Sequence, residues 1–111
     1  MQKSTVRALN KSESIKAEKA LFKAIVSLKT PEECSAFFKD LCTPAELTAM
    51  ADRWRVAQLL AEGKKSYRDI HDETGVSLAT IGRVARFLTH ESYQGYRAIL
   101  ERTKNLPLHR H

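Results

Sequence analysis

Residues 66–88 read SYRDIHDETGVSLATIGRVARFL, and they contain two short helical patterns on either side of Thr74-Gly75-Val76. The second pattern repeats apolar residues every three or four positions, at Leu78, Ile81, Val84 and Leu88, which places them on one helix face. We expect Gly75 to turn the chain at positive φ and Ser77 to cap the second helix. Two helices joined by a short turn that contains glycine predict a helix-turn-helix, whose second helix enters the DNA major groove.

Helical patterns also account for the sequence on both sides of this motif. Thr30-Pro31 and Thr43-Pro44 are each followed by a glutamate three residues after the threonine, which is typical of a capped helix start. No strand pattern or repeat competes, so the predicted fold class is all-α with six helices. Besides the motif, the predicted helices are 12–29, 31–41, 44–62 and about 93–104. The predicted domains are a flexible basic arm (1–11), a helical domain (12–104) and a frayed tail (105–111).

Size and charge limit what this protein can be. A chain of 111 residues with 42% hydrophobic content has room for one modest core. Phe22 and Val26 widen the apolar face of the first predicted helix beyond what one neighbour can cover, so we expect a homodimer. The formal net charge of +6 favours a polyanionic partner.

Other classes of function have little support in the sequence. There is no nucleophile paired with a base, no metal-ligand spacing and no phosphate-binding glycine loop, so we expect no enzyme and no cofactor. Cys34 and Cys42 are expected to be small buried thiols in a reducing cytoplasm. No apolar run approaches the roughly 20 residues of a membrane span, and a cytoplasmic protein without membrane contacts is therefore predicted.

Several motifs resemble the Trp repressor superfamily, namely Leu41–Leu47, Leu59–Gly63 and Ser77–Arg83. Ala49–Arg55, Tyr67-Arg68, Gly82–Leu88 and Gly95–Arg97 are similar to its YerC/YecD-type branch. The resemblance covers about residues 15–104. It implies a six-helix subunit that interleaves with its twin into an obligate homodimer. The first three helices and the last would build that dimer, and the fourth and fifth would bind double-stranded DNA.

The resemblance also assigns a DNA-facing surface. The positions that match the groove-facing ones are Tyr67, Arg68, His71, Leu78, Ala79, Thr80 and Gly82. Arg68 is the best candidate to contact a guanine, whereas Lys64, Lys65 and Ser66 are placed to meet phosphate. Two alternatives stay open: Arg68 could pair with Asp72 on its own helix, and Gly82 could serve packing against the long helix instead of close approach to DNA.

A possible effector pocket is where this chain departs from the resemblance. Thr43, Arg53 and Arg83 match positions that line the family's indole amino acid site. Val84 and Phe87 stand where the family has glycine and serine, and their bulk is expected to fill the cavity. As an alternative, Phe87 and Trp54 are ordinary core aromatics.

These expectations define a sequence-specific DNA-binding transcriptional regulator, such as a bacterial repressor, that does not respond to tryptophan. The rival interpretation is a helical protein-interaction module of the same fold that has lost specific DNA binding. The basic charge and Arg68 favour DNA, and Gly82 mildly favours the rival.

Overall fold

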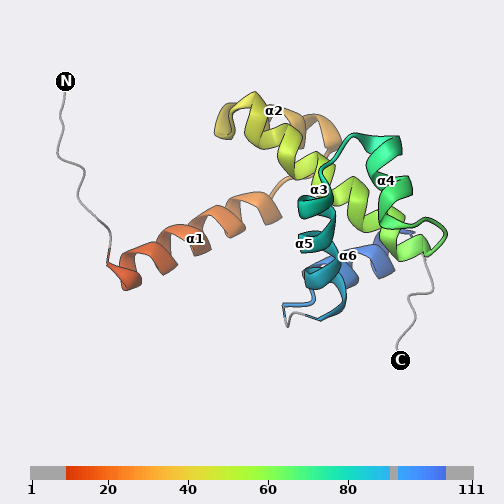
Figure 1. Ribbon diagram of the computed structural model, residues 1–111. Coiled ribbons are helices and arrows are strands. Elements are labelled where there is room, and N and C mark those ends of the chain that lie inside the picture. Colours follow the sequence, from red (N-terminus) through yellow and green to blue (C-terminus); the bar gives the residue numbers. More distant parts are fainter. Residues whose placement is uncertain (1–9, 91–92, 105–111) are drawn as a thin grey trace, which may run out of the picture. The chain divides into compact units, whose positions relative to one another are not determined.

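The computed structural model describes residues 10–90 and 93–104, and within these ranges the chain forms six helices and no strand (Figure 1). The all-α expectation is therefore confirmed. The chain divides into two compact units with a boundary between Leu41 and Cys42, a division that the sequence pattern did not indicate. The helices are α1 (Lys11–Val26), α2 (Pro31–Leu41), α3 (Pro44–Glu62), α4 (Tyr67–Thr74), α5 (Leu78–Thr89) and α6 (Gly95–Lys104).

The two Thr-Pro signals begin α2 and α3 at the predicted residues, but they do so with different hydrogen bonds. At α3, Thr43 accepts from the backbone N–H of Glu46 (3.1 Å), and the Glu46 carboxylate accepts from the N–H of Thr43 (2.8 Å). At α2, the Thr30 hydroxyl accepts from the N–H of Glu33, but the Glu33 carboxylate accepts from the N–H of Lys29. Glu33 thus satisfies the donor one residue before the predicted one.

The first and last helices differ from the prediction at their ends. Asn10 and Glu13 form a capping box that begins α1 at Lys11, so the predicted arm is shorter by its last residue. Helix α1 ends at Val26 instead of position 29, and the Ser27 hydroxyl donates to the carbonyl of Ala24 (2.7 Å). Helix α6 begins at Gly95, because Gln94 has a φ of 64° that no right-handed helix accommodates. The rest of the arm and the tail, residues 1–9 and 105–111, lie outside the described residues.

The first unit leaves its apolar side chains largely uncovered. Every residue of α1 and α2 is described, and none is buried. Ile15, Phe22 and Val26 are 46%, 54% and 83% exposed. A helix with so much apolar surface in water lacks a partner for that surface.

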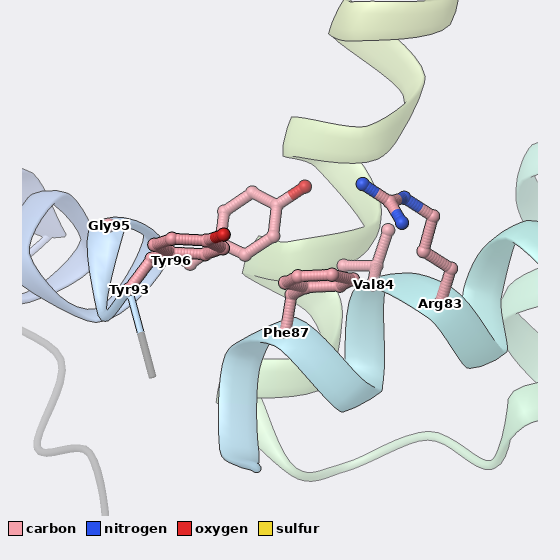
Figure 2. Close-up of a pocket in the computed structure, with 6 residues that line it drawn as sticks. All are labelled: Arg83, Val84, Phe87, Tyr93, Gly95 and Tyr96. Carbon is pink, nitrogen blue, oxygen red and sulfur yellow. The ribbon is translucent and has the colours of Figure 1, made fainter. Parts of the chain in front are cut away.

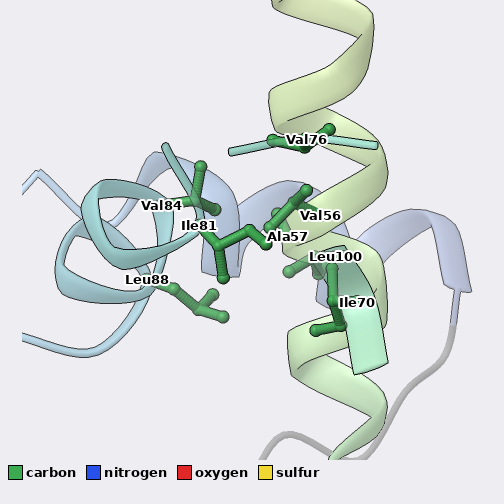
Figure 3. Packing of buried hydrophobic residues seen from close by; sticks show 8 residues of the cluster. All are labelled: Val56, Ala57, Ile70, Val76, Ile81, Val84, Leu88 and Leu100. Carbon is green, nitrogen blue, oxygen red and sulfur yellow. The ribbon is translucent and has the colours of Figure 1, made fainter. Parts of the chain in front are cut away.

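The second unit is organised around α3, which contacts α4, α5 and α6. Val56 and Ala57 of α3 are fully buried. They pack in one cluster with residues from the other three helices and the turn, namely Ile70, Val76, Ile81, Val84, Leu88 and Leu100 (Figure 3). Trp54 packs against this cluster and stacks on Tyr96, with ring centres 6.4 Å apart. Through this cluster, α4 and α5 both pack against α3.

Membrane insertion has no support among the described helices. None of them combines the length and the apolar character that crossing a bilayer requires.

Candidate nucleic-acid interface

The turn between α4 and α5 is closed by hydrogen bonds on both sides of Gly75. Gly75 has a φ of 77°, as predicted, and its N–H donates to the carbonyl of His71 (2.8 Å). The Thr74 hydroxyl donates to the carbonyl of Ile70 (2.7 Å) and accepts from the N–H of Val76 (3.0 Å). The bond from Gly75 pairs the His71 carbonyl, one of the groups that helix α4 leaves without an intrahelical partner at its end.

His71 lies on the inner side of this turn. Its Nδ1 atom is 2.7 Å from the carbonyl oxygen of Val76, and the side chain is partly buried. A carbonyl oxygen only accepts, so Nδ1 carries the proton and Nε2 is the nitrogen left for other contacts. His71 was expected to face the DNA groove. In the structure its ring also makes a hydrogen bond that stabilises the turn.

Two serines cap the helices of the motif. Ser66 accepts from the N–H of Asp69 (3.0 Å), and Asp69 accepts from the N–H of Ser66 (3.3 Å), so the two residues form a capping box at the start of α4. Ser77 accepts from the N–H of Thr80 (3.1 Å) and donates to the Thr80 hydroxyl (3.0 Å), which confirms the predicted cap. The Ser66 hydroxyl therefore has its own hydrogen atom left to donate to a phosphate.

Arg68 is exposed on α4 and makes no hydrogen bond or ion pair with any described residue. The alternative pairing with Asp72 is therefore not formed. Tyr67 and Leu78 are 47% and 43% exposed, and Ala79 is exposed beside Leu78 at the start of α5. The motif thus presents one free guanidinium group among apolar and aromatic side chains, a combination that can contact base edges and thymine methyl groups.

The two lysines before α4 have different surroundings. Lys65 Nζ lies 3.2 Å from the Glu73 carboxylate, which is also 4.0 Å from the Arg55 guanidinium. Lys64 is exposed and makes no ion pair within the described ranges. Glu73 and Arg55 were missed at the sequence level because the contact joins the end of α4 to α3, and helical spacing within one element does not reveal it.

Gly82 lies in the interior of α5, where glycine costs roughly 1 kcal/mol relative to alanine. A Cβ atom built at this position would meet nothing within 4 Å. Packing against α3 therefore does not require the glycine.

The predicted effector residues are only partly brought together. Arg83, Val84 and Phe87 line an open hollow of about 360 Å³, together with Tyr93, Gly95 and Tyr96 (Figure 2). Thr43 and Arg53 do not line this hollow, and the Thr43 hydroxyl is engaged in capping α3. Val84 is 1% exposed and belongs to the core.

Phe87 is half-buried and, unlike Trp54, is not among the side chains that pack against the buried cluster. The guanidinium carbon of Arg83 lies 4.3 Å from the centre of the Phe87 ring, and that of Arg86 lies 5.3 Å from it. Tyr93 stacks on Phe87 with ring centres 6.3 Å apart and planes 5° apart. Tyr93 was missed because it lies at the expected start of the last helix, which in the structure begins only at Gly95, so helical periodicity does not indicate its direction.

This architecture and its exposed surface define a helix-turn-helix protein. The chain belongs to the Trp repressor family: the family described as Trp repressor protein matches residues 16–104. The uncharacterised protein YerC of Bacillus subtilis (strain 168) is 48% identical over 84 residues, which are 76% of this chain and 79% of YerC. The resemblance to the YerC-type branch is confirmed.

Two solved structures share the fold. A TrpR-like protein from Eubacterium eligens ATCC 27750 is 41% identical with a TM-score of 0.75, covering 84% of this chain and 94% of that one. A Staphylococcus aureus protein provisionally described as a Trp repressor is 36% identical with a TM-score of 0.77, covering 91% of this chain and 100% of that one. The family and these neighbours are regulators of the Trp repressor type and not enzymes.

Proposed function

We propose that this protein is a sequence-specific DNA-binding transcriptional regulator that acts as a homodimer in the cytoplasm. The observation that carries the proposal is the exposed Arg68 on a hydrogen-bonded helix-turn-helix that also exposes Tyr67, Leu78 and Ala79. An arginine fixed only by its backbone is free to make a bidentate contact with a guanine. The net charge of +6 supports attraction to the duplex.

Each residue of the proposed interface has a distinct role. Arg68 and the α5 residues Leu78, Ala79 and Thr80 would contact base edges, and Lys64, Lys65 and Ser66 would contact phosphates without reading sequence. Tyr67, His71 and Gly82 complete the proposed surface.

Selection of bound sites from a random duplex pool, followed by binding of the selected duplex at several salt concentrations, tests this proposal. We expect log affinity to fall linearly with log salt. Arg68→Ala should cost about 1–3 kcal/mol on the selected duplex and reduce base preference, whereas Lys65→Ala should weaken all duplexes about equally. If neither substitution changes binding, the interface is misplaced.

The rival function is a protein-interaction module without specific DNA binding. It predicts that no sequence is enriched in the selection and that Arg68→Ala has no effect on duplex binding. The unpaired state of Arg68 among the described residues favours the DNA-binding function.

The homodimer is proposed on the exposed apolar side chains of α1. Ile15, Phe22 and Val26 lie on a helix that buries none of its residues within the chain. Burial of apolar surface contributes about 25 cal/mol per Å², so covering this face by a second copy would stabilise both subunits.

We further propose that tryptophan does not switch this protein. The Arg83 guanidinium already lies over an aromatic ring, that of Phe87, and by the resemblance Arg83 is one of the two arginines between which the family holds the indole. Admitting an indole there would separate Arg83 from Phe87. Calorimetry with L-tryptophan at millimolar concentration decides the question: we expect no saturable heat, and saturable heat with a matching gain in DNA affinity would contradict the proposal.

A further inference from the structure

We infer that Gly82 lets α5 seat deeply in the DNA major groove, because the missing side chain lets the helix backbone approach the sugar–phosphate wall. This inference rests on the proposed function. It assigns position 82 a steric role that determines how tightly the specific site is bound.

First, neither packing nor backbone conformation within the fold requires glycine at position 82. The structure offers open space around a Cβ atom at position 82, so alanine would fit without moving a neighbour. Gly82 is also not one of the glycines with positive φ, which are Gly63 and Gly75. A glycine in a helix interior that neither packing nor backbone conformation requires lowers the stability of the fold for no internal gain.

The second step is where Gly82 lies on the helix. Ile81 and Val84 point into the core, whereas Ala79 and Arg83 are exposed on the opposite side. With about 100° per residue, Gly82 falls between these two faces, on the flank of α5. Leu78 precedes it and Arg86 follows it by one turn on the same flank.

The third step is the fit of a helix in the groove. A helix with its side chains is roughly 10–12 Å across, and the major groove is about 12 Å wide. The flanks of a recognition helix therefore lie close to the two sugar–phosphate strands that form the groove walls. At Gly82 no side chain projects from this flank of α5. The DNA strand can therefore approach the helix backbone, and the exposed Ala79 can reach deeper into the groove.

Two kinds of DNA binding should respond differently to a side chain at position 82. Binding to random duplex depends on charge and does not require deep insertion. A Cβ atom at position 82 should therefore weaken binding to the selected site and leave binding to random duplex and its salt dependence unchanged.

The test is Gly82→Ala, with Gly82→Leu as a larger step at the same position. We expect Gly82→Ala to raise the Tm by a few degrees, because alanine favours the helix, and yet to weaken binding of the selected duplex about tenfold. Gly82→Leu should weaken it more. Affinity for random duplex should stay within about twofold of that of the unmodified protein.

Ala98→Gly, at an exposed position of α6, is the matched control. It should lower the Tm and leave affinity for the selected duplex unchanged, which separates stability from binding. If Gly82→Ala binds the selected duplex as tightly as the unmodified protein while Arg68→Ala does not, the inference is wrong and the proposed function stands. If Gly82→Ala lowers the Tm, or weakens self-association in sedimentation, the glycine serves the fold or a second copy, and the inference is also wrong. If the unmodified protein binds no duplex at all, both fail.

Discussion

Removing the negative charge of Glu73 should strengthen DNA binding. Its carboxylate lies 3.2 Å from Lys65 Nζ and 4.0 Å from the Arg55 guanidinium, so it neutralises a lysine that we place against phosphate. Glu73→Gln keeps the shape of the side chain and removes its charge. Lys65 would then be free to follow a phosphate.

The size of the effect follows from the exposure of these groups. The side chains of Lys65, Glu73 and Arg55 are 36%, 43% and 53% exposed, so water and salt screen the interaction, and the pairs contribute less than about 1 kcal/mol. Releasing Lys65 should therefore raise affinity about two- to fivefold at low salt. Because Glu73 would no longer compete with phosphate for Lys65, the plot of log affinity against log salt should steepen, by at most about 0.9.

Fluorescence anisotropy with a labelled duplex at several salt concentrations measures both quantities. Asp72→Asn is the matched control, because it removes the same charge from an exposed position of α4 where no ion pair with a described residue is lost. Its effect measures the general change in net charge. In a Lys65→Ala background, Glu73→Gln should add nothing beyond that general change. An equal gain with and without Lys65 would refute the reasoning.

Three further predictions concern the fold and the assembly. Sedimentation at micromolar concentration should show a dimer that Phe22→Asp dissociates, since that side chain is 54% exposed in the single chain; a folded monomer of the unmodified protein would contradict this. Gly75→Ala should lower stability by about 1–2 kcal/mol in chemical unfolding, because its φ of 77° disfavours a side chain, and an unchanged unfolding midpoint would oppose that explanation. Thr43→Ala should cost about 1 kcal/mol through loss of the α3 cap, whereas Thr43→Ser should restore most of it; equal stabilities would show that the cap contributes little.

Local chemistry explains why so much of the fold is predictable. The signals that begin α2 and α3 and end α4 depend only on residues within about four positions in the sequence. These signals are Thr30-Pro31, Thr43-Pro44 and the turn at Gly75, so the ends they mark can be predicted from the sequence. The ends of α1 and α6 are less accessible to such reasoning. Asn10 was not identified as a cap, and the positive φ of Gln94 belongs to a residue type that seldom adopts it.

The candidate site is predictable to a smaller extent, because its key contacts join separate elements. The resemblance, and not periodicity, places Arg68 and Leu78 on an exposed surface, and both are exposed in the structure. Periodicity groups Leu78 with Ile81, Val84 and Leu88, which are buried. It cannot reveal that Glu73 holds Lys65 and Arg55, or that Phe87 stacks on Tyr93 instead of entering the core. Such contacts depend on side-chain rotamers and on how a loop returns to the domain.

The hydrogen bonds around Gly75 have a thermodynamic consequence. The Thr74 hydroxyl and the His71 ring join the end of α4 to the backbone of Val76, which leads into α5. The orientation of α5 relative to α4 is therefore established when the chain folds. The conformational entropy of this segment is lost during folding and not when a partner binds, so its association should carry little entropic penalty from ordering the protein backbone.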